Sequence, residues 1–113
     1  MKFILLIYHN EHDFAGQTEP QRQELYAEYR QLREELQGKK QFVDGSQLTP
    51  SSTATCVRVQ EGEPLITDGP FAETKEQLGG YFLVDAESLD QAMDIAKRIP
   101  SARSGTIEVR ALI

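Results

Sequence analysis

Short runs of strand character alternate along the chain with two longer stretches of helical periodicity. The first run, Lys2 to Tyr8, is almost continuously apolar, as expected of a central strand that is covered on both faces. The residues from His9 to Thr18 are polar and include Gly16, which predicts a loop. The chain therefore opens with a buried strand and a polar connection.

The first helix is predicted to begin near Thr18 and to stop at Gly38. Thr18 and Gln21 have the spacing of a capping box, and Pro20 lies in the first turn, where its missing N–H costs little. Apolar residues then recur at spacings of four, three and four, which places them on one stripe of the helix. The stripe consists of Leu25, Tyr29, Leu32 and Leu36.

The second helix repeats the same logic, with a capping-box pattern at Ser88 and Gln91 and a stop at Pro100. Its predicted apolar stripe consists of Leu89, Ala92, Met93, Ala96 and Ile99. Further strands are expected over residues 42–48, 79–85 and 106–113 and in a hairpin over residues 53–67. Without the hairpin, the order is the βαββαβ of a ferredoxin-like plait, so the chain is predicted to be one α+β domain over residues 1–113.

Composition narrows the classes of function. Of the 113 residues, 39% are hydrophobic and 27% charged, and the net charge is -6. An acidic chain without a basic cluster lacks the electrostatic footprint of a nucleic-acid-binding protein. No apolar run approaches the roughly 20 residues of a membrane-spanning helix, and the N-terminus does not resemble a signal peptide. The single cysteine, Cys56, excludes an intramolecular disulfide and predicts a half-buried strand residue in a cytoplasmic protein.

The segment Asp68–Glu76 is the strongest candidate for chemistry. Gly69 permits a sharp turn, Pro70 fixes the next φ angle, and Phe71 is expected to anchor the loop by burying its ring. The ionisable side chains of the segment are then expected to face a cleft. They are those of Asp68, Glu73, Lys75 and Glu76. A tight turn with solvated carboxylates explains the same residues. The glycines at 79 and 80 predict a close approach of another backbone or of a ligand.

His9, at the end of the first strand, is the candidate acid–base residue, with Asp68 as its orienting partner or as the base. Tyr8 and Tyr81 are candidates to present hydroxyls to a ligand, although burial with one hydrogen bond explains them equally well. Lys75 suits either an anionic ligand or an ion pair that holds the loop.

Metal binding by His9 and His12 with Glu11 or Asp13 has weak support, because the spacing matches no strong pattern. No phosphate loop, dinucleotide fingerprint or zinc signature is present. No metal and no cofactor are therefore expected.

The segment Thr67–Tyr81 resembles the signature of the DGPF group of YCII-related proteins. The opening strand, the hairpin, Leu89–Ala92 and Gly105–Arg110 are also similar to that family, so the resemblance covers nearly the whole chain. It implies a ferredoxin-like fold that pairs into a dimeric α/β barrel, with a cleft near the DGPF loop. Residues Tyr8, Gly69, Pro70, Phe71, Lys75 and Tyr81 would then be ligand-binding.

Two main functions follow as hypotheses, and whether the protein is an enzyme stays open. The first is a homodimeric module that binds a small molecule beside the DGPF loop, in a regulatory setting like that of relatives found beside sigma factors. The second is an acid–base enzyme that uses Asp68 with His9. A cofactor-free monooxygenase is a third hypothesis, supported by fold analogy alone. No nucleic-acid or membrane partner is expected.

Overall fold

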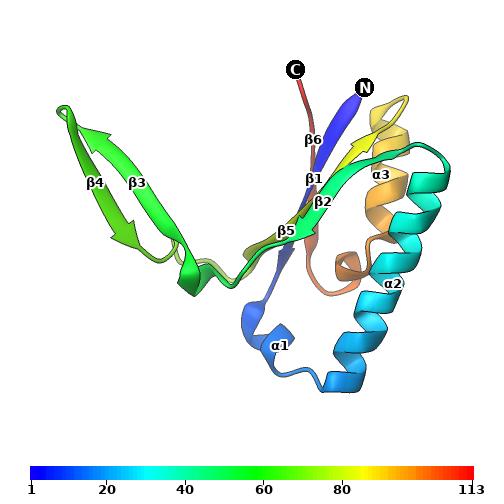
Figure 1. Ribbon diagram of the computed structural model, residues 1–113, viewed down its shortest axis with the longest axis horizontal. Coiled ribbons are helices and arrows are strands. Elements are labelled where there is room, and N and C mark those ends of the chain that lie inside the picture. The colour runs from blue at the N-terminus through cyan, green and yellow to red at the C-terminus, as the bar shows by residue number, and fades with distance from the viewer.

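The computed structural model describes all 113 residues, which form an α+β fold with a protruding hairpin (Figure 1). Its elements are β1 (Lys2–His9), α1 (Glu11–Ala15), α2 (Glu19–Gly38), β2 (Phe42–Gln47), the 3-10 helix η1 (Ser51–Thr53), β3 (Thr55–Gln60), β4 (Glu63–Asp68), β5 (Gln77–Asp85), α3 (Leu89–Arg98), the 3-10 helix η2 (Pro100–Arg103) and β6 (Thr106–Ala111). No helix is both long and apolar enough to cross a membrane.

Four strands form one antiparallel sheet in the order β2-β5-β1-β6. This order and the βαββαβ connectivity are those of a ferredoxin-like plait, as the sequence predicts. The helices α2 and α3 lie on one side of the sheet (Figure 1). Strand β1 is central, between β5 and β6, as predicted, but helices cover only one of its faces: alternate residues are buried, and Ile4 and Leu6 on the other face are half-buried.

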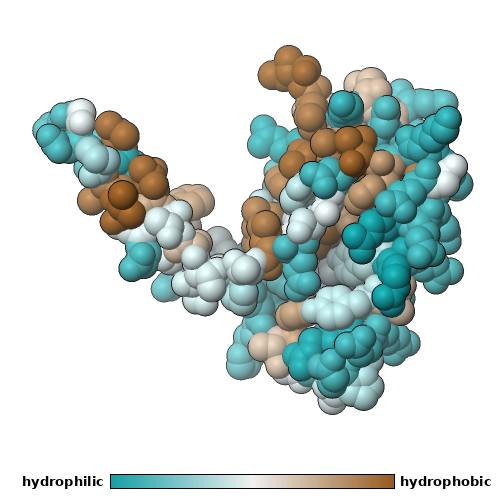
Figure 2. Space-filling view, viewed as in Figure 1, coloured by the Kyte–Doolittle hydropathy of each residue, from teal (hydrophilic) through white to brown (hydrophobic).

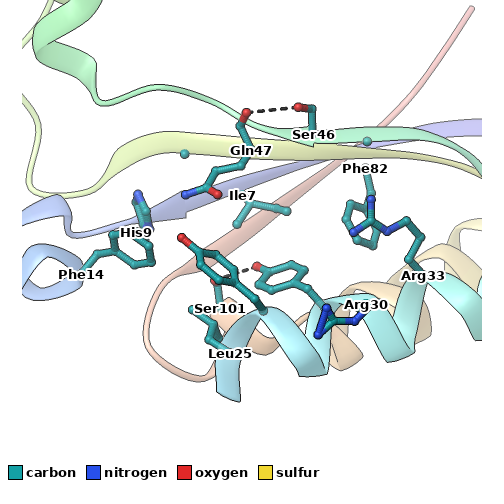
Figure 3. Close-up of a pocket in the computed structure, with 15 residues that line it drawn as sticks. Ile7, His9, Phe14, Leu25, Arg30, Arg33, Ser46, Gln47, Phe82 and Ser101 are labelled. Carbon is teal, nitrogen blue, oxygen red and sulfur yellow. Dashed lines mark hydrogen bonds between the residues drawn. The ribbon is translucent and has the colours of Figure 1, made fainter. Parts of the chain in front are cut away.

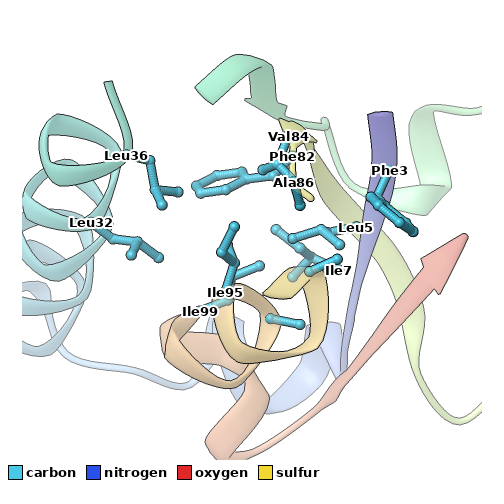
Figure 4. Close-up of a cluster of buried hydrophobic side chains, with 12 residues drawn as sticks. Phe3, Leu5, Ile7, Leu32, Leu36, Phe82, Val84, Ala86, Ile95 and Ile99 are labelled. Atoms are coloured by element: carbon cyan, nitrogen blue, oxygen red, sulfur yellow. The ribbon is translucent and has the colours of Figure 1, made fainter. Parts of the chain in front are cut away.

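The hydrophobic core fills the space between the sheet and the two long helices (Figure 4). Alternate residues of β1 and β5 point into it, and α2 and α3 contribute one stripe each. Its largest fully buried side chains are Phe3, Leu5, Leu36, Val84 and Ile99. The Phe42 and Phe82 rings meet edge to face with centroids 5.3 Å apart, which is a favoured aromatic geometry.

Both predicted helix starts are confirmed. The Thr18 side chain accepts from the Gln21 N–H, and the Gln21 side chain accepts from the Thr18 N–H, which completes the capping box. At α3 the Ser88 side chain accepts from the Gln91 N–H, but the Gln91 side chain accepts from Glu87 instead of Ser88. The second box is therefore only half formed.

Two predictions about helices were wrong in detail. Residues 9–18 are not all loop, because Asn10 caps the short helix α1 by accepting from the Asp13 N–H at 3.0 Å. In α3 the buried face includes Ile95, whereas Leu89 and Met93 are 52% and 39% exposed. The other predicted members of the stripe, Ala92, Ala96 and Ile99, are buried as expected.

The hairpin of β3 and β4 leaves the body of the molecule and forms an arm on the side of the sheet opposite α2 and α3 (Figure 1). Its turn at Glu61 and Gly62 has positive φ at both positions, as a tight two-residue hairpin turn requires. At the base of the arm, Gly69 adopts φ +88°, and its N–H donates to the Ala54 carbonyl at 2.7 Å. Cys56 is half-buried on this arm, as predicted.

Candidate functional site

A cavity of about 480 Å³ opens between the N-terminal half of α2 and the sheet (Figure 3). It lies next to the core, and Tyr29 of α2 and Phe82 of β5, whose ring centroids are 6.0 Å apart, belong to its lining. Its lining residues are Ile7, His9, Phe14, Leu25, Tyr26, Tyr29, Arg30, Arg33, Gly45, Ser46, Gln47, Gly79, Gly80, Phe82 and Ser101. A volume of this size is typical of sites for small organic molecules.

The helical wall of the cavity continues the stripe that the sequence predicts for α2. Leu32 and Leu36 are buried in the core, whereas Leu25 and Tyr29 are half-buried and line the cavity. Tyr26 adds a second aromatic ring to this wall and is 36% exposed. One stripe therefore has two roles: its C-terminal half packs and its N-terminal half borders open space.

The sheet wall is shaped by the paired glycines of β5. A Cβ placed on Gly79 would lie 2.5 Å from Nε2 of His9, and one on Gly80 would lie 2.8 Å from the Ser46 carbonyl oxygen. The neighbour of Gly80 is backbone, so this position requires glycine, whereas a side chain at position 79 would displace the His9 ring. The prediction that another backbone approaches this pair closely is confirmed at Gly80. Gly79 leaves the room in which the His9 ring lies.

The His9 ring lies at one end of the cavity against Phe14, with ring centroids 5.1 Å apart (Figure 3). The imidazole forms no hydrogen bond within the chain. Both ring nitrogens are therefore available to water or to a ligand. Phe14 comes from α1, the short helix that the sequence pattern missed.

A part-buried hydrogen bond joins two residues that line the cavity. The Tyr29 hydroxyl donates to Oγ of Ser101 at 2.7 Å, and Ser101 is only 8% exposed. Burial of the ring raises the pKa of Tyr29 above its ordinary value, since the charged phenolate is disfavoured away from water. Tyr29 is therefore a neutral hydrogen-bonding group and not a base at neutral pH.

Residues 75–77, within the DGPF signature Thr67–Tyr81, connect distant parts of the chain. The Lys75 carbonyl accepts from Nδ2 of Asn10 at 3.3 Å, and the Gln77 side chain accepts from the Glu11 N–H at 3.0 Å. Oε1 of Glu76 accepts from the Thr106 hydroxyl at 2.8 Å. These bonds hold the end of β1, and with it His9, in place. Residues 75–77 thus support the cavity from outside.

Of the eight residues that the sequence suggests for the site, only His9 lines this cavity. Asp68 is exposed at the end of β4, and no hydrogen bond joins it to His9. Lys75 forms no ion pair. The pairing of Asp68 with His9 and the ligand-binding roles of Gly69, Pro70 and Lys75 stay predictions.

The expectation that Phe71 anchors its loop by burial was wrong, because its ring is 79% exposed. Tyr8 and Tyr81 are both half-buried, and neither borders the cavity. The Tyr81 hydroxyl donates to Oδ2 of Asp44 at 3.0 Å, and this bond raises the pKa of Tyr81. The Tyr81 hydroxyl thus forms one hydrogen bond within the protein, as expected if this residue is structural and does not bind a ligand.

The two cations of the cavity, Arg30 and Arg33, were not among the residues predicted for the site. A signal was present, because Tyr26, Arg30 and Arg33 each follow a member of the apolar stripe by one position. Residues so placed border the stripe and not the opposite face. They line a cavity only because the stripe itself does.

Comparison with known proteins agrees with the sequence resemblance. A family model described as the YCII-related domain matches residues 1–113. An uncharacterized protein of Rhizobium meliloti (strain 1021), R00369, is 46% identical over 69 residues, which make up 59% of this chain. The matched region spans 56% of that relative's length.

Proposed function

This chain belongs to the YCII-related family, and we propose that it binds a small organic molecule in the cavity between α2 and the sheet. The observation that supports this proposal is the cavity itself. Six of its fifteen lining residues are apolar or aromatic, and six others carry polar side chains. Such a combination of shape and lining is typical of ligand sites in proteins.

A fragment screen followed by amide chemical shifts in ¹H–¹⁵N spectra tests the proposal. Flat aromatic fragments are expected to shift the amides of Ile7, Ser46 and Gly80. Leu25→Trp fills the cavity with an indole and is expected to abolish these shifts. Leu89→Trp adds the same ring at an exposed position of α3 and is the matched control. Fragments that bind both variants equally, or none that bind at all, would contradict the proposal.

Acid–base catalysis at the same cavity is a second candidate, favoured by the place of His9. Its imidazole lines the cavity and has no partner within the chain. A histidine side chain that contacts a bound molecule is a common general acid or base. Once a ligand is known, the variant His9→Gln distinguishes the two functions. An enzyme would lose turnover of the ligand in this variant, whereas a binding protein has no turnover to lose.

The proposed binding protein is also a homodimer, and the arm supports this part of the proposal. The radius of gyration is 15.9 Å, against about 13 Å for a compact domain of this length. One face of the arm is apolar and open to solvent (Figure 2), with Val57, Val59 and Ile66 between 63% and 69% exposed. A second copy of the chain would cover this surface and the sheet face that bears no helix.

Light scattering is expected to give twice the chain mass of 12.8 kDa at micromolar concentration. Ile66→Lys should shift the protein toward monomer, because it buries a charge in the proposed interface. Thr67→Lys adds the same charge at the next position, on the other face of the strand, and should leave the dimer intact. A monomeric wild type, or equal effects of the two variants, would refute the assembly.

A further inference from the structure

The cavity has an unusual charge balance for this chain. The protein contains 18 Asp and Glu residues and has a net charge of -6. None of these carboxylates lines the cavity, whereas two arginines and one histidine do. The ionisable groups that line the cavity are therefore cationic or neutral, although the protein as a whole is acidic.

Both arginines are without a protein partner. Arg22, Arg98 and Arg103 each form an ion pair with a glutamate. Arg30 and Arg33 form neither an ion pair nor a hydrogen bond within the chain. Lying three residues apart on α2, they are neighbours on one helix surface, so both guanidinium groups are able to reach one ligand.

The shape of the cavity defines the rest of the ligand. Arg33 reaches from α2 toward the sheet, and the Phe82 ring and Ile7 form the apolar wall beyond it (Figure 3). Phe14 and His9 close the far end. Phe82 and Ile7 are buried core residues, so this wall offers an apolar surface and not a charged one. A flat apolar body fits between the arginines and His9.

We infer that the ligand is a small aromatic or planar carboxylate, whose anionic group is bound by Arg30 and Arg33 and whose ring lies against Phe82. A guanidinium matches a carboxylate with two parallel N–H···O bonds, which makes arginine the usual residue for this recognition. The inference rests on the proposed function, because it assigns a ligand class to the same cavity.

Three probes of one shape test the charge preference: 2-naphthoate, its neutral carboxamide, and 2-naphthylmethylammonium. Binding to the full-length protein is followed by amide shifts in ¹H–¹⁵N spectra. The carboxylate is expected to bind about tenfold to a hundredfold more tightly than the carboxamide, since hydrogen bonds to charged groups contribute about 1.5–3 kcal/mol. The ammonium probe is expected to bind most weakly.

The double variant Arg30→Gln, Arg33→Gln should bring the carboxylate down to the affinity of the carboxamide. Arg22→Gln is the matched control. Arg22 lies on the same helix, but it does not line the cavity. Equal affinity for all three probes would overturn the ligand class and leave the proposed function standing. Absence of binding by every probe, or shifts that all lie outside the cavity, would overturn both.

Discussion

The two halves of the space beneath α2 differ, although one helix and one sheet form both. At the C-terminal half, Leu32 and Leu36 pack against Phe82 and Val84, and little or no water reaches them. At the N-terminal half, Leu25 and Tyr29 border a cavity of about 480 Å³. A regular apolar stripe thus specifies the face that a helix turns inward, but not whether that face is packed.

The cause of the difference lies in the strands opposite the helix. Val84 is fully buried above the C-terminal half, and Phe82, which is 6% exposed, lies at the boundary, where it belongs to the core and also lines the cavity. Gly45, Gly79 and Gly80 occupy the strands that line the cavity and contribute no side chain there. Small residues on the sheet therefore leave the cavity open, and large ones close the core.

The largest expected effect comes from truncating the two ends of the stripe. Leu36→Ala should cost about 2–5 kcal/mol in the free energy of unfolding, because it empties a fully buried site. Leu25→Ala should cost clearly less, since its side chain already faces open space. Urea unfolding of the two variants measures both values. Equal losses would mean that both halves are packed core, and the comparison would fail.

A smaller effect is expected at Tyr29, which lies at the boundary between the two halves. Tyr29→Phe removes the donor to the buried Ser101 hydroxyl and should cost about 1 kcal/mol. Tyr26→Phe, a hydroxyl without a partner in the structure, is the control on the same helix. The double variant with Ser101→Ala should show a coupling between positions 29 and 101 but none with position 26.

The comparison of wild type with Tyr29→Phe also predicts how the free energy of unfolding depends on pH. Because burial raises the pKa of folded Tyr29 above its ordinary value of 10.0, the neutral hydroxyl stabilises the fold fully below that pH. This contribution is lost as the pH rises through the folded pKa. The stability difference between wild type and Tyr29→Phe should therefore narrow above pH 10. A difference independent of pH would contradict the buried hydroxyl.

Much of the fold was predictable, because its signals are local. Thr18 and Gln21 mark the start of α2 within one turn, and Glu61 and Gly62 mark the tip of the hairpin. Helix α1 was not predictable in this way. Its first residue, Glu11, accepts two hydrogen bonds from Ser51, at 2.7 Å each, across 40 positions in the sequence. A five-residue helix held by such distant contacts leaves no periodic pattern.

The candidate site was predictable only in part. His9 was found because a histidine at a strand end is a recognisable acid–base group. Arg30 and Arg33 were missed because charged residues beside an apolar stripe normally face solvent. The DGPF signature Thr67–Tyr81 was predicted to form the site, yet its residues 75–77 form the contacts that hold the end of β1. A distinctive motif does not show whether it binds a ligand or supports the residues that do.

The sequence by itself determined the order of the strands and of the two long helices, the face that α2 turns inward and the insertion of the hairpin. These features depend on periodicity, caps and turns, which act between residues close together in the chain. Only the tertiary structure decided which part of the α2 stripe is packed, where the free arginines lie and that Phe71 stays exposed. Those outcomes depend on side-chain volumes and charges brought together from distant positions, and no local pattern encodes them.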